Sequence, residues 1–284
     1  MSLGVLNNIA AMYAQNNLNQ TQASLQKTLT QLSSGSRINS GADDAAGLAV
    51  ADGLAANEAA LTQSAQNASD GVGLLQTADG ALAQVTNLLN RAVTLATEAS
   101  NGTLNTSQVS AANQEYQNIL TEISNIGSTT NFNGNSVFTS TATNIVVSDG
   151  TTSGTTTFSD TIGSLTSSSV GTSSGGAGVD FTASTVSTLT ASTAQSVLVA
   201  LTSAIQDVAY QRGAIGANIN QLNAASNVAS AESENLTSAE SNIRSTNYGQ
   251  ATSDMAKYQV LSQTGISALA QANSVAQEVL KLLQ

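Results

Sequence analysis

The sequence predicts a mainly α protein, in which long helices from the N- and C-terminal halves form a coiled coil or bundle with a small β-hairpin insert. Apolar residues recur at steps of three and four over long stretches of both halves, which is the period of an amphipathic helix. A Ser- and Thr-rich segment without this period separates the two halves. The 284-residue chain contains no proline, which suits uninterrupted helices.

The N-terminal segment, residues 1–42, carries a weak apolar seam. Leu18, Leu25 and Leu32 lie one heptad apart, and Ser33-Ser34-Gly35 follows the last of them. We therefore expect a helix that ends near Gly35 and that needs a partner for its seam.

Residues 43–138 hold two stronger helical patterns. The first is Leu75, Ala78, Leu82, Val85, Leu89, Ala92, Ala96 and Ala99, and the second is Val109, Ala112, Tyr116, Ile119, Ile123 and Ile126. Gly102 and Gly127 lie where glycines that end helices are expected, and Asn105, Thr106 and Ser107 are candidate N-caps. The patterns predict two helices joined by a turn.

The C-terminal half repeats the pattern. In residues 195–246 the apolar positions run from Leu201 to Ile243, which predicts one long helix or a pair. In residues 247–284 two parallel stripes share one helix. A helix that is apolar over so wide a sector needs partners on more than one side.

The insert, residues 139–194, has a different composition. About half of the stretch from Thr139 to Ser196 is Ser or Thr, and it contains no Lys or Arg. Residues 144–147 and 155–158 are β-branched runs separated by Ser148-Asp149-Gly150, which predicts a β-hairpin. Residues 171–178 are expected to form a mobile loop. Because about residues 151–178 have no helical period and few apolar residues to bury, we expect this stretch to lie on the outside.

Composition and charge exclude several classes of function. The chain contains no His and no Cys, so catalysis that needs imidazole or thiolate and zinc sites with such ligands are ruled out. A net charge of −11 repels nucleic acid and anionic lipid, and no apolar run is long enough to span a membrane. The first basic residue is Lys27, so we expect no Sec-type signal peptide. No enzyme activity, metal or cofactor is expected.

Three motifs resemble bacterial flagellins. Residues 32–49, LSSGSRINSGADDAAGLA, are similar to the N-terminal signature of that family almost residue for residue. QTG at 263–265 and LAQAN at 269–273 resemble its C-terminal segment, and NFNG at 131–134 matches the point where its helices give way to β structure. The resemblance covers roughly residues 1–140 and 195–284.

The resemblance implies a secreted, non-enzymatic subunit that self-assembles into the extracellular flagellar filament for motility. Its two termini, residues 1–42 and 247–284, would pair as the inner coiled coil, and residues 43–138 and 195–246 would form an outer helical domain. The implied partners are further copies of the chain, an export chaperone, and the cap and hook-associated proteins. We expect the termini to fold as subunits associate, because isolated amphipathic helices are marginally stable in water.

The candidate site is the polymerisation interface. It comprises Leu18, Leu25, Leu32, Arg37, Asp43, Asp44, Arg91, Leu95, Glu115, Leu261, Leu269, Val275, Val279, Leu280 and Leu283. The resemblance further implies that Arg91, Leu95 and Glu115 contact the animal toll-like receptor for flagellin. Val93 and Thr94 stand where the family has a second Arg and a Glu. The adjacent carboxylates Asp43 and Asp44 are interpreted as a helix cap rather than as an acid–base pair.

Three alternatives remain open at this level. A hook–filament junction protein shares flagellin-like ends, although such proteins commonly carry Pro beside the acidic pair. A secreted enzyme with similar helices is a second alternative, which the absence of His and Cys disfavours. A monomeric coiled-coil adhesin is the third, and an image of concentrated protein distinguishes its rods from filaments.

Overall fold

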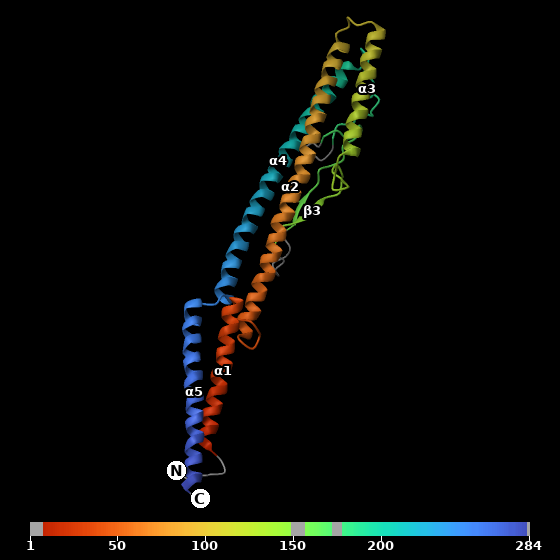
Figure 1. Ribbon diagram of the computed structural model, residues 1–284. Helices are drawn as coiled ribbons and strands as arrows, with labels where there is room; N and C mark the ends of the chain where they lie inside the picture. Colours follow the sequence, from red (N-terminus) through yellow and green to blue (C-terminus); the bar gives the residue numbers. More distant parts are fainter. Residues whose placement is uncertain (1–7, 149–156, 172–177, 283–284) are drawn as a thin grey trace. The chain divides into compact units, whose positions relative to one another are not determined.

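The computed structural model describes residues 8–148, 157–171 and 178–282, and it confirms the predicted mainly α fold (Figure 1). The helices, in chain order, are α1 Ile9–Ser34, α2 Ala45–Ser100, α3 Thr106–Thr129, α4 Ala194–Arg244 and α5 Tyr248–Leu282. The strands are β1 Asn131–Phe132, β2 Asn135–Ser136, β3 Thr143–Val146 and β4 Thr157–Asp160. Where the sequence predicts one long helix or a pair in residues 195–246, the structure has a single helix, α4.

The chain divides into two compact units. Residues 1–56 and 235–284 form one, here called the terminal unit, and residues 57–234 form the other, the central unit. In the terminal unit α1 and α5 run side by side (Figure 1). In the central unit α2, α3 and α4 enclose an apolar core with the described part of the insert.

The core of the central unit follows the periodicity of the sequence. Every position of the series from Leu75 to Ala99 on α2 is buried, as are Tyr116 and Ile123 on α3. On α4, Leu201 and Leu222 are fully buried as well. The stripes on these three helices therefore cover one another, which the hydrophobic effect favours.

Local sequence signals set the helix ends around the turn between α2 and α3. Gly102 has φ 65°, the left-handed conformation that glycine adopts without a steric penalty. The Asn105 side chain accepts a hydrogen bond from the Gln108 N–H at 3.0 Å, and the Gln108 side chain accepts one from the Asn105 N–H at 2.9 Å. This reciprocal capping box fixes the start of α3, and Asn105 is the N-cap among the predicted candidates.

Gly127 does not end a helix, so its predicted role is wrong. It lies inside α3, which continues to Thr129. A Cβ at this position would collide with the backbone carbonyl of Leu165, a residue of the insert. Glycine is used here because the insert approaches the helix closely, which is a tertiary requirement and leaves no local sequence signal.

The predicted hairpin is present, and its second strand continues to Asp160, two residues past the expected end. β3 pairs with β4 in the antiparallel sense, with Ile145 opposite Phe158. β1 and β2 form a second antiparallel pair around Asn133 and Gly134, which both have positive φ. Residues 149–156, which include the expected turn and the first expected positions of the second strand, lie outside the described residues, as do residues 172–177 of the expected mobile loop.

The insert contributes directly to the core, so the expectation that residues 151–178 have few apolar residues to bury is wrong. Its buried side chains are Phe158, Ile162, Leu165, Val170, Phe181, Val186 and Leu189. α3 also binds its backbone: Tyr116 Oη donates to Val186 O at 2.8 Å, and Asn113 Oδ1 accepts from the Leu189 N–H at 2.7 Å. Isolated apolar residues in a Ser- and Thr-rich segment carry no period, which is why the sequence pattern missed them.

Candidate assembly surface

Large apolar side chains remain exposed on both helices of the terminal unit. Tyr13 on α1 is 68% exposed and Val260 on α5 is 63% exposed. The other exposed members of this set are Ile9, Met12, Leu29, Tyr248, Leu261 and Ile266. Ile9, Met12 and Tyr13 lie at i, i+3 and i+4 on α1, so they are neighbours on one helix face. Exposed apolar side chains that adjoin in this way mark an interaction site.

The pairing of α1 with α5 covers the terminal stripes only in part. Leu18, Leu25 and Leu32 are half-buried, and Leu18 contacts Gly265, where a Cβ would lie 3.3 Å from Leu18 Cδ1. Leu269 is half-buried, whereas Leu261 is exposed. The side chains of the other predicted interface residues of α5, Val275, Val279, Leu280 and Leu283, lie outside the described part of the chain.

Asp43 is held within the chain by several hydrogen bonds. Its carboxylate lies 2.8 Å from the Lys27 ammonium and accepts hydrogen bonds from the backbone N–H groups of Asn39 and Ser40 at 3.2 and 3.1 Å. The Lys27 contact, followed by the hydrogen bonds from Asn39 and Ser40, lowers the pKa of Asp43 from 3.8 to about 2. Asp43 therefore connects α1 to the loop before α2.

Asp44 has the capping role that the sequence predicts. Its Oδ1 accepts a hydrogen bond from the Gly47 N–H at 2.8 Å, directly before the start of α2 at Ala45. A carboxylate at this position satisfies one of the free N–H groups of the first turn and interacts favourably with the helix dipole. The two neighbouring carboxylates thus have separate structural contacts.

We expect the Asp43 carboxyl to titrate near pH 2, and Lys27→Gln to move its midpoint upward toward 3.8. Because the pKa is lower in the folded chain, the stabilisation from this contact is complete above about pH 4 and disappears as the pH falls through about 2. Carbon-detected NMR of the side-chain carboxyl measures the midpoint. Lys257→Gln, which removes the same charge from a lysine lying over the Tyr258 ring, is the control. An unchanged midpoint in Lys27→Gln contradicts the assignment.

Arg91 and Glu115 form an exposed bidentate pair between α2 and α3. Arg91 Nε lies 2.6 Å from Glu115 Oε1, and Nη2 lies 3.0 Å from Oε2. Each partner favours the charged form of the other, so the pKa of Arg91 is raised and that of Glu115 is lowered. Leu95, predicted beside them at the interface, is only 2% exposed and packs in the core. Its side chain is therefore not available to a partner in this conformation.

Sequence reasoning identified Arg37 but missed the residues around it. Arg37 Nη2 donates to the Ile243 carbonyl at 2.7 Å, near the end of α4. Arg244 binds Glu240 and Asp52, both at 2.9 Å. The Glu240 and Arg244 spacing of i, i+4 on one helix is a signal that could have drawn attention to this ion pair. The contact to Asp52 on α2 could not be found from local spacing.

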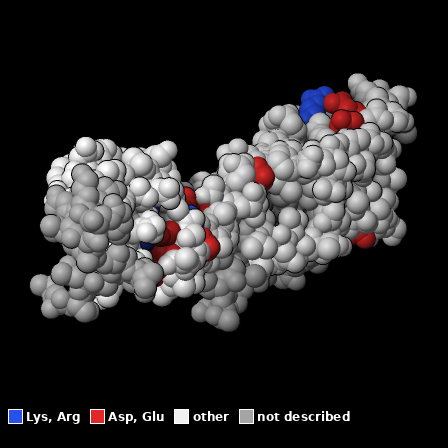
Figure 2. All heavy atoms as spheres, turned by 60° about the horizontal axis from the view of Figure 1, so that its bottom comes forward, with Lys and Arg blue, Asp and Glu red and all other residues white. Residues whose placement is uncertain are grey.

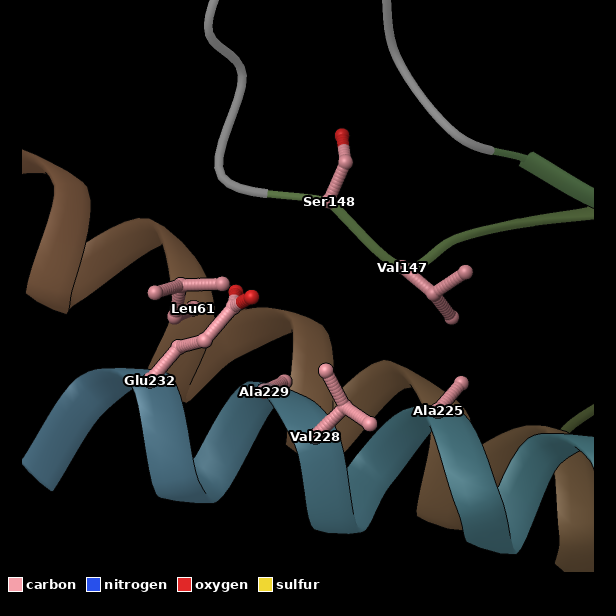
Figure 3. Close-up of a pocket in the computed structure, with 7 residues that line it drawn as sticks. All are labelled: Leu61, Val147, Ser148, Ala225, Val228, Ala229 and Glu232. Atoms are coloured by element: carbon pink, nitrogen blue, oxygen red, sulfur yellow. The ribbon is translucent and has the colours of Figure 1, made fainter.

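One pocket of the described surface lies in the central unit. A pocket of about 370 Å³ lies among α2, α4 and the residues after β3, as Figure 3 shows. It is lined by Leu61, Val147, Ser148, Ala225, Val228, Ala229 and Glu232. Glu232 is the one ionisable side chain of this lining, so the pocket lacks the second acid or base that proton-transfer chemistry uses.

Three further properties concern metals, membranes and surface charge. Within the described ranges, no three carboxylates gather in a way that could hold a metal ion. Nor does any helix in that part of the chain combine the length and hydropathy needed to cross a bilayer. Few charged side chains are visible on the face of the molecule that Figure 2 shows. Neutral side chains, both polar and apolar, therefore form most of that face.

The two ends of the chain match known families in the same order as its helices. The model described as "Bacterial flagellin N-terminal helical region" matches residues 5–143, and the one described as "Bacterial flagellin C-terminal helical region" matches residues 198–283. These segments contain α1 to α3 and most of α4 with α5. The insert core lies between them.

Two relatives to which this chain is similar are flagellins by name. A flagellin of Halalkalibacterium halodurans is 34% identical over 277 residues, which cover 98% of this chain and 98% of the relative. Flagellin 1 of Proteus mirabilis is 41% identical over 144 residues, 51% of this chain and 40% of the relative. A crystal structure of Bacillus cereus flagellin is 29% identical, with a TM-score of 0.47 over 57% of this chain and 88% of that chain.

The extent of these matches differs among the relatives. The match covers 40% of the Proteus mirabilis relative and 25% of phase 1 flagellin of Salmonella naestved, whereas the Halalkalibacterium halodurans relative is matched over 98% of its length. That end-to-end match includes the terminal helices, the central helices and the insert. Together with the two family models, it shows that this chain belongs to the bacterial flagellin family.

Proposed function

We propose that this chain is a structural subunit of the bacterial flagellar filament, and that its terminal helices complete their folding as neighbouring copies cover them. The observation that carries the proposal is the exposed apolar surface of the α1 and α5 pair. Tyr13 and Val260 are more than half exposed although both lie on helices that already have a partner. Packing against further copies of the same chain would bury such a surface. When the same contact repeats from copy to copy without closing, it produces an open helical polymer.

The energetics of the terminal unit support coupled folding and association. Among the described residues of α1 only Thr28 is buried, and on α5 only Ala251. Ordering a residue costs roughly 1 to 2 kcal/mol of conformational free energy, which a helix pair with so little burial offsets poorly. Burial against neighbouring copies adds the missing stabilisation.

Family membership supports the finer parts of the proposal. We extend the proposed function to export from the cell and to contacts with an export chaperone and with the cap and hook-associated proteins. We also extend it to an animal toll-like receptor, for which Arg91 and Glu115 are exposed whereas Leu95 is buried. The end-to-end match with a flagellin favours a filament subunit over the hook–filament junction protein. An apolar assembly surface also favours it over an enzyme or a monomeric adhesin.

We expect trypsin to cut dilute monomers first at Lys27 and Lys257 in the terminal unit, and filaments to resist at the same enzyme ratio. Both lysines are exposed on helices with few buried side chains, whereas Arg91 and Arg212 lie on helices of the packed central unit. Mass spectrometry of the first fragments locates the cuts, and negative-stain microscopy of the same concentrated sample identifies filaments.

Two results separate the parts of this proposal. Concentrated protein that stays monodisperse in the images contradicts the role as a filament subunit. Filaments together with equal resistance of Lys27 and Arg91 in dilute monomers contradict coupled folding and leave the subunit role intact. A short unstructured peptide with one lysine, added to both samples, serves as the internal reference for enzyme activity.

A further inference from the structure

Backbone hydrogen bonds in the terminal unit join two short segments that are more than 200 residues apart in the sequence, one after α1 and one at the end of α4. The Arg37 N–H donates to Arg244 O at 2.7 Å, and the Thr246 N–H donates to Gly35 O at 3.0 Å. The two segments run antiparallel, as in one rung of a β-ladder. We call residues 35–37 and 244–246 the clasp. It connects the chain after α1 with the chain before α5.

Side chains reinforce the clasp at the ends of two helices. Arg37 Nη2 donates to Ile243 O at 2.7 Å, and Gln31 Nε2 in the last turn of α1 donates to Arg37 O at 2.9 Å. Carbonyl groups in the last turn of a helix lack intrahelical partners, and a cationic donor also suits the negative end of the helix dipole. Arg37 thus binds the end of α4 while its own carbonyl is bound by α1.

Arg244 extends the clasp to α2. Its Nη2 lies 2.9 Å from Asp52 Oδ1, and its Nη1 lies 2.9 Å from Glu240 Oε1. The planar guanidinium group therefore holds carboxylates of two helices at once, which its rigid arrangement of donors favours. The backbone carbonyl of the same residue accepts the hydrogen bond from Arg37. Arg244 is the residue at which α2, α4 and both loops meet.

The few buried side chains of the paired helices are concentrated near the clasp. Thr28 lies in the last two turns of α1 before Gly35, and Ala251 lies in the first turn of α5. Tyr248 covers Gly35, where a Cβ would lie 2.9 Å from Tyr248 Oη. Farther along, α1 and α5 contact each other with half-buried or exposed side chains, such as Leu18 against Gly265. Among the side chains that the structure describes, those near the clasp are therefore the best packed of the pair.

We infer that the clasp is the nucleus from which α1 and α5 pair, and that Arg37 and Arg244 are positioning residues for assembly. Pairing two helices is cooperative, and its first contacts are the least favourable because they order both segments before burial accumulates. The clasp supplies these first contacts by fixing the end of α1 beside the start of α5. The inference rests on the proposed function only where it concerns assembly of the paired helices.

Hydrogen exchange of the full-length monomer, measured by mass spectrometry, tests the nucleus. In the wild type, amides of residues 248–256 should exchange more slowly than those of residues 262–274. Arg244→Gln and, as a second variant, Arg37→Ala should accelerate exchange of residues 28–34 and 248–256 together by ~10-fold or more, while the central unit is unchanged. Seeded filament elongation should slow in the same two variants.

Arg212→Gln is the matched control. Arg212 also joins α4 to α2, through Asp79 at 2.7 Å, and its exposure of 37% is close to the 36% of Arg244. We expect this variant to leave exchange of α1 and α5 unchanged. Three results overturn the inference. In the clasp variants, the change in exchange is confined to α4. In the wild type, exchange is uniform along α5, or Arg212→Gln and Arg244→Gln change the exchange of α1 equally.

The exchange result and the assembly result fail separately. Wild-type protein that forms no filaments, together with the expected exchange pattern, refutes the proposed function and supports the clasp as the nucleus of helix pairing. Filaments from the wild type, together with unchanged exchange of α1 in both clasp variants, refute the clasp and leave the proposed function standing.

Discussion

Val260→Asp combined with Ile266→Asp should abolish filament formation without changing the monomer. Both side chains are more than half exposed on α5, so in the free subunit the new carboxylates remain in water. If neighbouring copies cover these positions, each unpaired carboxylate costs about 3 kcal/mol or more on burial. Two such penalties raise the concentration needed for assembly by ~10⁴-fold. Light scattering and negative-stain microscopy measure assembly, and circular dichroism monitors the monomer.

The control for this variant adds the same charge to polar neighbours. Gln259→Asp combined with Ser267→Asp places two carboxylates on the same helix at exposed positions. These changes replace no apolar contact, so assembly should be affected much less than in the first variant. Filaments of normal length from Val260→Asp with Ile266→Asp show that this part of α5 is not an interface. An equal loss of assembly in both double variants attributes the effect to charge alone.

Phe181→Ala should destabilise the central unit by about 3 to 5 kcal/mol, the usual cost of removing a buried aromatic side chain. Phe181 belongs to the insert and is only 1% exposed, in contact with the core that α2, α3 and α4 share. The cost includes the lost apolar burial and the cavity that remains. Urea denaturation followed by circular dichroism measures the change in the free energy of unfolding.

Thr185→Ala, four residues later in the insert and exposed, is the matched control and should change stability by about 0.5 kcal/mol or less. If Phe181→Ala is as stable as this control, the insert is an outer addition and the core of the central unit is complete without it. A loss shared by the two variants points instead to an effect of the insert backbone.

Much of the helical framework could be predicted because helix formation leaves local signals. The three- and four-residue steps from Leu75 to Ala99 identified the buried face of α2, and Asn105 and Asp44 were recognisable as caps. Each of these features involves residues within a few turns of one another. The flagellin resemblance of residues 32–49 was likewise contained in one short segment.

The insert, the clasp and Gly127 could not be predicted because they depend on contacts between distant segments. Phe181 and Leu165 occur singly among Ser and Thr, so no period marks them as core residues. Gly127 has the sequence context of a helix end, yet its lack of a Cβ serves the approach of Leu165. Arg244 meets Asp52 across 192 residues, a separation at which spacing carries no information.

The sequence by itself determined which segments are helices, which face of each helix is apolar, and the family to which the motifs point. The tertiary structure alone decided which of those apolar faces are covered. Leu95 and Val260 both lie on amphipathic helices, but Leu95 is 2% exposed and Val260 is 63% exposed. An amphipathic period shows that a face gains from burial, whereas the surface that buries it is supplied by other parts of the chain or by another copy.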